Sequence, residues 1–172
     1  QHYAGRLTLG GSGRFSGSAL RFDDRVEGVQ DLLLQTDTLH AAAAIGGTGT
    51  LAISPLDTGR TIGVAGGAGA LQVPQAVLDN AAGFARHVIG RADGSGTIDI
   101  GALRLRSNTS LQTGNGDIGL NGSVDGAFDP PAVGVAPGSS SLVRLRVRAR
   151  RSFFRRAERQ LDFEIEASEP DH

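Results

Sequence analysis

Cysteine, lysine and tryptophan are absent from the 172 residues, and aromatic residues make up only 5% of them. The absence of cysteine excludes disulfides, thiol catalysis and Cys-ligated metals. The absence of lysine excludes a phosphate-binding P-loop, although the segment from Gly63 to Gly69 is rich in glycine. Because large rings are so few, the core must be built from Leu, Ile, Val and Ala in thin layers.

Strong charge and long apolar runs are also missing. The formal net charge is −1, which provides no general attraction to nucleic acid or to an anionic membrane. No stretch approaches the roughly 20 apolar residues that a membrane-spanning helix needs. We therefore expect no nucleic-acid partner, no membrane insertion and no bound cofactor.

Glycine is abundant instead, with 26 residues that separate short strand-like segments. The segment Gly11–Phe22 resembles Gly94–Leu105, 83 positions later (94 − 11 = 83), because both begin with Gly-Ser-Gly and continue to Ala-Leu-Arg. Shorter matches occur as well. Thr97–Gly101 resembles Asp117–Asn121 at an offset of 20 and Thr50–Ser54 at an offset of 47, and Leu34-Gln35-Thr36 recurs as Leu111-Gln112-Thr113. These offsets indicate a unit near 20 residues, with 47 representing two units plus an insertion, and such periods are typical of solenoids.

The predicted fold is all-β, a right-handed parallel β-helix (β-solenoid) with one short helical insertion. Parallel strands stacked about 4.8 Å apart satisfy the backbone of each turn from the turns above and below it. Small apolar side chains then stack inward as ladders, and right-handed crossovers are the rule for parallel connections.

The insertion is predicted between Pro74 and Gly83, where proline at the start and glycine at the end mark a helix. In this helix Val77, Leu78 and Ala81 would face the stack. A strand over residues 86–90 follows.

We divide the chain into β-helix repeats over 1–128, a Pro/Gly/Ser linker over 129–140 and a charged strand pair over 141–172. Residues 141–150 alternate apolar residues with arginine, and residues 161–167 alternate apolar residues with acids. Paired antiparallel, they would set arginines against carboxylates. The pair either forms a C-terminal charged β-hairpin that caps the stack or continues the stack, since terminal repeats are atypical.

Four segments of the repeat region resemble one family of proteins. They are Gly49–Pro55, Gly59–Leu71, Val88–Gly96 and Ser110–Gly122. Their sequence pattern resembles that of the repeat units of filamentous-haemagglutinin-type bacterial exoproteins, and the likeness covers roughly residues 5–128. The resemblance implies a secreted or cell-surface β-helical adhesin, exported through an outer-membrane secretion partner by a two-partner route. It implies attachment to a glycan or protein receptor of a host cell or matrix. The charged tail departs from the family pattern.

Catalytic and metal-binding patterns are weak. His2, His40, His87 and His172 have no metal-ligand spacing, and we interpret His87 as a surface or hydrogen-bonded histidine. The segment Asp93–Asp99 lacks the carboxylate spacing of a calcium loop. Asp23 with Asp24, or Asp117 with Asp125, could form the acid pair of a polysaccharide-cleaving β-helix enzyme, although aspartate is also a favoured turn residue.

The most basic segment is the best candidate for a polyanion-binding surface. Its residues are Arg144, Arg146, Arg148, Arg150 and Arg151. The acidic strand that follows would neutralise them internally. The sequence therefore predicts a non-enzymatic structural segment of an adhesin, with a β-helical polysaccharide-cleaving enzyme and a polyanion-binding tail as alternatives.

Overall fold

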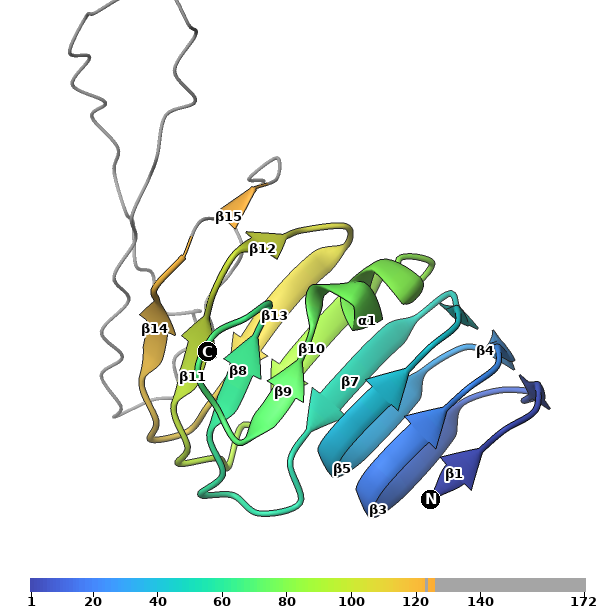
Figure 1. Cartoon of the computed structure of the whole chain (residues 1–172), viewed down its shortest axis with the longest axis horizontal. Helices are drawn as coiled ribbons and strands as arrows, with labels where there is room; N and C mark the ends of the chain where they lie inside the picture. Colours follow the sequence, from blue (N-terminus) through green and yellow to red (C-terminus); the bar gives the residue numbers. More distant parts are fainter. Residues whose placement is uncertain (123, 126–172) are drawn as a thin grey trace, which may run out of the picture.

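Short strands separated by glycine-rich turns wind into a parallel β-solenoid of about six turns, as the sequence predicts. The computed structural model describes residues 1–122 and 124–125 (Figure 1). Half of the structure is strand, and the one helix among the described residues is short. The predicted linker over 129–140 and the charged strand pair over 141–172 lie outside the described residues, so both stay predictions.

The strands of the described residues form four parallel sheets along the stack. The six-stranded sheet contains, in spatial order, β1 (His2–Tyr3), β3 (Gly13–Phe22), β5 (Leu32–Ala41), β7 (Thr50–Ser54), β10 (Arg86–Gly90) and β13 (Asn108–Gln112). The four-stranded sheet contains β14 (Ile118–Leu120), β11 (Ile98–Ile100), β8 (Ile62–Val64) and β9 (Leu71–Val73). A three-stranded sheet contains β2 (Leu7–Thr8), β4 (Val26–Val29) and β6 (Ile45–Gly47). A two-stranded sheet pairs β12 (Leu103–Arg104) with β15 (Val124–Asp125).

The strand registers confirm a repeating unit near 20 residues. Leu32 pairs with Leu51 (51 − 32 = 19), and Ile98 pairs with Ile118 (118 − 98 = 20). Across the insertion, Ile53 pairs with Ile89 (89 − 53 = 36). The matched segments Thr97–Gly101 and Asp117–Asn121 are therefore structurally equivalent, one turn apart.

Inward-facing aliphatic residues stack directly over one another. Leu34, Ile53 and Ile89 occupy successive turns of one ladder, and each is 0% exposed. Leu111 extends the ladder above Ile89. Full burial of such a side chain stabilises a fold by about 1.5–3 kcal/mol. Aligned aliphatic columns thus make up most of the core, together with the buried rings of Phe22 and Phe84.

The longest sequence match, at an offset of 83 residues, does not correspond to equivalent positions in the stack. Gly11–Phe22 runs into β3 of the six-stranded sheet, whereas Gly94–Leu105 contains β11 and β12, which lie in two other sheets. Likewise Thr50–Ser54 is β7, whereas Thr97–Gly101 contains β11. A glycine turn followed by an alternating strand can form on any face of the solenoid. The match therefore indicates a shared local motif and does not show which strands pair.

An additional loop, before the insertion that the sequence predicts, packs on the four-stranded sheet. Residues 65–70 join the parallel neighbours β8 and β9, although parallel connections usually need a dozen residues or more. A Cβ at Gly63 would collide with the Gly67 carbonyl, and a Cβ at Gly67 with the backbone of Asp99. The Asp99 carboxylate accepts the Ala68 N–H at 2.6 Å. The glycines of this segment therefore permit close backbone packing.

The predicted insertion contains the expected helix, α1 (Gln75–Asn80), with Pro74 as its N-cap. Val77 and Leu78 are buried, as expected, and so is Ala81 just beyond the helix. The Gln75 side chain takes the place of a β partner for β12, because its Nε2 donates to the Arg104 carbonyl and its Oε1 accepts the Arg104 N–H, each at 2.9 Å. No helix in the described residues combines the length and hydropathy of a membrane span.

Candidate functional site

Three corner loops stack along one edge of the solenoid (lower edge of Figure 1) and form what we call the corner ledge. It consists of residues 55–61 between β7 and β8, 91–97 between β10 and β11, and 113–117 between β13 and β14. In earlier turns the chain passes this corner inside the continuous strands β3 and β5. After β7 the connection at this corner becomes a loop. The reason is that β9 lies between β5 and β8, so β8 stands one strand further along the stack than β7 does.

Backbone hydrogen bonds continue from loop to loop across the ledge. The Ser95 N–H donates to the Thr58 carbonyl at 2.7 Å, and the Gly114 N–H donates to the Gly94 carbonyl at 2.7 Å. The hydroxyl of Thr113 also donates to the Gly94 carbonyl, at 3.2 Å. The loops thus continue the ladder of the strands, which holds the ledge in a defined shape.

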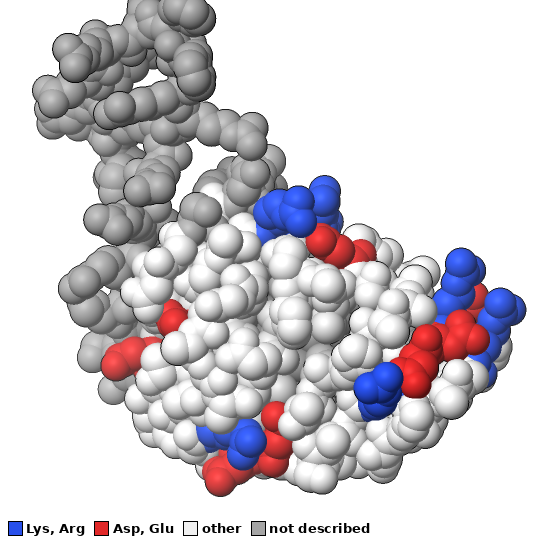
Figure 2. All heavy atoms as spheres, in the orientation of Figure 1, with Lys and Arg blue, Asp and Glu red and all other residues white. Residues whose placement is uncertain are grey.

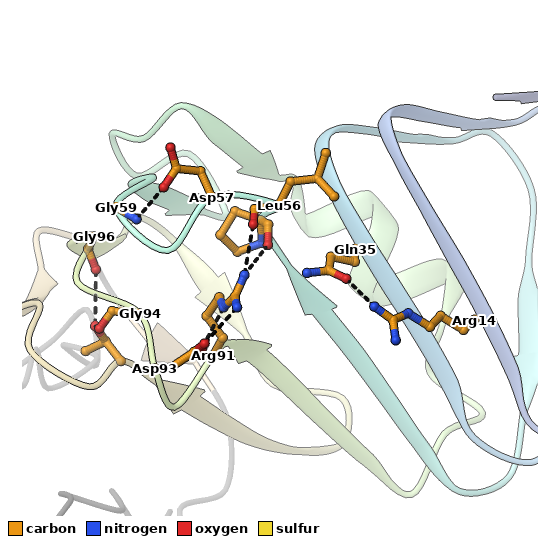
Figure 3. Close-up of polar contacts among 11 residues, drawn as sticks. Arg14, Gln35, Leu56, Asp57, Gly59, Arg91, Asp93, Gly94 and Gly96 are labelled. Carbon is orange, nitrogen blue, oxygen red and sulfur yellow. Dashed lines mark hydrogen bonds and ion pairs between the residues drawn. The ribbon is translucent and has the colours of Figure 1, made fainter.

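Arg91 ties two of these loops together (Figure 3). Its Nε and Nη2 donate to the two carboxylate oxygens of Asp93 at 2.6 and 2.8 Å. Its Nη1 donates to the carbonyls of Leu56 at 2.9 Å and Pro55 at 3.3 Å. Bidentate charge-assisted pairs are among the stronger polar contacts in proteins. Arg91 therefore acts as a clamp between the first and second loops of the ledge.

Two of the three carboxylates of the ledge, those of Asp57 and Asp93, are engaged with their own loops. The hydrogen bond from Arg91 holds the pKa of Asp93 below its ordinary value, and an oxygen of Asp57 accepts the Gly59 N–H at 2.9 Å. A carboxyl group whose pKa is lowered stays ionised at neutral pH, so Asp93 is not suited to donate a proton. The ledge is better suited to hydrogen bonding than to acid–base chemistry.

Replacing Asp93 by Asn should lower the thermal stability at pH 7, because the ion pair with Arg91 is lost. The folded-state pKa of Asp93 lies below its ordinary value of 3.8, so its contribution is present above that value. It disappears as the pH falls through the lower folded-state pKa. The difference in Tm between Asp93→Asn and the unmodified chain should thus shrink below about pH 3.8. The matched control is Asp117→Asn, since Asp117 is exposed on the same ledge. Equal shifts for both variants at pH 7 would contradict the clamp.

The ledge presents mainly polar groups to solvent. Its exposed residues include Asp57, Thr58, Asp93, Ser95, Thr97, Asn115 and Asp117. Leu56 is the exposed large hydrophobic residue among the described residues, at 36%. Hydroxyl, amide and carboxylate groups on stacked loops suit recognition of a polar, hydroxyl-rich ligand.

The residues of the two candidate acid pairs differ in their surroundings, and the enzyme alternative stays a prediction. Asp23 contacts His2 Nε2 at 2.6 Å and Arg21 Nε at 2.7 Å. Hydrogen bonding to His2 and then to Arg21 holds the pKa of Asp23 below its ordinary value. Asp24 accepts the N–H of Arg25. The other pair is divided as well, because Asp117 directly precedes β14 whereas Asp125 belongs to β15 of a different sheet.

The three histidines among the described residues, His2, His40 and His87, belong to the separate strands β1, β5 and β10. His87 is buried at 1% exposure in an inward ladder between Leu51 and Thr109, and its Nε2 donates to the Ala81 carbonyl at 3.0 Å. This confirms a hydrogen-bonded structural histidine. Within residues 1–122 and 124–125, His, Asp and Glu form no group of three that could hold a metal ion.

The five arginines of the candidate polyanion surface, Arg144, Arg146, Arg148, Arg150 and Arg151, lie outside the described residues, so this proposal stays a prediction. Sequence reasoning missed the clamp of Arg91. The spacing Arg-x-Asp directly before Gly94-Ser95-Gly96 was the available signal, because a charged pair two residues apart can close across a turn.

No protein-family model, curated protein or solved structure matches this chain.

Proposed function

We propose that the chain is a rigid, non-enzymatic segment of a secreted or surface-exposed bacterial adhesin. In this role it attaches the cell to a glycan or protein receptor on a host cell or matrix. The observation that carries the proposal is the stacked polar ledge on a continuous solenoid. A stack of turns with aligned cores presents an extended surface whose loops repeat at strand spacing. The resemblance of four repeat segments to filamentous-haemagglutinin-type exoproteins favours the same role and an outer-membrane export partner.

Charge favours a polar ligand over a strongly ionic one. Figure 2 shows one face of the solenoid largely without charged side chains, with positive and negative atoms next to one another at its margins. Several arginines have acidic partners, including Arg21 with Asp23, Arg60 with Asp37 and Arg91 with Asp93. Paired charges leave little net field to steer a polyanion. Hydrogen bonds from the ledge would therefore supply most of the recognition of a glycan.

The test is binding of the full chain to a glycan array and to cultured host cells. The ledge variant combines Thr58→Ala, Ser95→Ala and Asn115→Ala, and the control combines Thr8→Ala with Asn108→Ala. All five residues are exposed, but Thr8 lies on β2 of another sheet and Asn108 begins β13, at the end of that strand opposite the ledge. We expect at least about a tenfold loss of affinity in the ledge variant, equivalent to about 1.4 kcal/mol, and no change in the control.

Two results would contradict the proposal. One is equal binding by the ledge and control variants, which would place recognition elsewhere. The other is release of sugar from any of a panel of acidic polysaccharides, which would favour the enzyme alternative, with paired carboxylates at the cleavage site.

A further inference from the structure

The last described turn leaves part of the core uncovered. Three of its inward apolar residues, Leu111, Leu120 and Val124, are only half-buried. The residues directly below them in register are almost completely buried: Ile89 at 0% under Leu111, Ile100 at 2% under Leu120 and Leu103 at 3% under Val124. The difference arises because, among the described residues, no further turn lies beyond these three.

The backbone at this end is open as well. β13, β14 and β15 each stand at the end of their sheet in the described structure. An uncovered strand edge is a template for aggregation, so proteins cover such edges with another segment. The β13–β15 end of the described solenoid therefore offers strand edges and apolar side chains for a further segment to cover.

At the other end of the described solenoid, apolar residues of the first turn such as Tyr3, Leu7 and Phe15 are half-buried too. The ring of Tyr3 stacks on Phe22 at 5.2 Å between centroids and meets the edge of Phe15 at 5.2 Å. The amide of Gln1 donates to the Ser16 carbonyl at 3.0 Å and its oxygen accepts the hydroxyl of Tyr3. Half-buried apolar residues are therefore present at both ends of the described stack.

The sequence that follows β15 contains a segment with the required pattern. One antiparallel register pairs residues whose numbers add to 310, from 143 with 167 to 149 with 161. In this register every apolar residue opposes an apolar residue and every arginine opposes an acid. Arg144, Arg146 and Arg148 then oppose Glu166, Glu164 and Asp162, and Val143, Leu145, Val147 and Ala149 oppose Ala167, Ile165, Phe163 and Leu161. One face of the pair is then apolar and the other carries opposite charges side by side.

We propose that residues 141–167 pair in this register and cover Leu111, Leu120 and Val124 with their apolar face. The covering segment belongs to the same molecule, because only 15 residues (126–140) separate it from β15. A short linker gives an effective concentration in the millimolar range, which favours this contact over one between molecules. The arginines face the acids in this arrangement and not a polyanion.

The first experiment locates the segment with a paramagnetic label. Because the chain has no cysteine, Ser141→Cys provides a single attachment site. The methyl signals of Leu111, Leu120 and Val124 should broaden, whereas those of Leu7 near the first turn should not. Broadening at Leu7 alone, or none at the last turn, would overturn the proposal. So would broadening of an unlabelled, isotope-enriched molecule mixed with the labelled one, because the cover would then be a second copy.

The second experiment measures hydrogen exchange in full-length variants. Val147→Asp places a charge on the apolar face of the pair, and Val133→Asp makes the same change in the linker. Amides of β13 and β14 should exchange at least about tenfold faster in Val147→Asp and at the original rate in Val133→Asp. Unchanged amides in β5 and β7 would verify that the stack remains folded. Equal exchange of β13 and β14 in both variants would overturn the proposal.

Discussion

Gly90→Ala should destabilise the protein by about 3 kcal/mol or more, a value at the upper end of single-residue effects. Gly90 is the last residue of β10, where the chain enters the corner ledge, and its φ of +100° is a conformation that side chains rarely adopt. A Cβ there would collide with the Gln112 carbonyl oxygen and lie 3.0 Å from Ile98 Cδ1. That carbonyl cannot move freely, because it also accepts the Arg91 N–H at 2.9 Å.

Two matched glycines separate backbone strain from close packing. Gly66 has a similar φ of +91°, but a Cβ there would meet no atom within 4 Å, so Gly66→Ala should cost only the strain of about 1–2 kcal/mol. Gly10 has neither constraint, and Gly10→Ala should change stability by less than about 1 kcal/mol. Chemical denaturation of the three variants gives the comparison. Equal costs at Gly90 and Gly66 would show that the approach to Gln112 is unimportant.

The repeating unit and many strands could be predicted because they depend on local signals. The strand predicted over residues 86–90 is β10, with Val88 outward and Ile89 inward. The match between Leu34 and Leu111 identifies two positions of one inward ladder. An alternating side-chain pattern and a glycine turn are present within ten residues of sequence, so both can be read without knowing the rest of the fold.

The assignment of strands to faces could not be predicted in the same way. Leu20 of β3 and Leu103 of β12 lie in equivalent sequence motifs but in different sheets. Which face a strand occupies depends on every corner before it. The loop over 65–70 and α1 change the number of corners, because they add β9 and a helix to one turn.

The contacts of side chains that replace backbone partners could not be predicted from the local sequence either. Gln75 bonds to Arg104, 29 residues later, and Arg91 bonds to Leu56, 35 residues earlier. Both contacts exist because the solenoid brings successive turns side by side. Without the register of the turns, the sequence does not show that Gln75 reaches Arg104 or that Arg91 reaches Leu56.

Ile89→Ala should destabilise the protein by about 2–5 kcal/mol, whereas Val88→Ala should cost about 1 kcal/mol or less. Ile89 is 0% exposed between Ile53 and Leu111 in the inward ladder. Val88 is its neighbour on the same strand but faces outward and is half-buried. Denaturant unfolding with an unchanged m-value would report the two stabilities. A reversed order would mean that β10 is shifted by one residue, since such a slip exchanges the two faces of a strand.

The position of Ile89 also predicts which strands lose stability in the Ile89→Ala variant. Each turn of a solenoid contacts mainly the turns next to it, so stability is close to a sum over neighbouring interfaces. Ile89→Ala weakens the contacts of β10 with β7 and β13, while the pairing of β3 with β5 is untouched. Amides of β10 and β13 should therefore exchange faster in the variant, and those of β3 and β5 should keep their rates. A uniform increase along the chain would instead indicate one cooperative unit, in which the turns do not unfold independently.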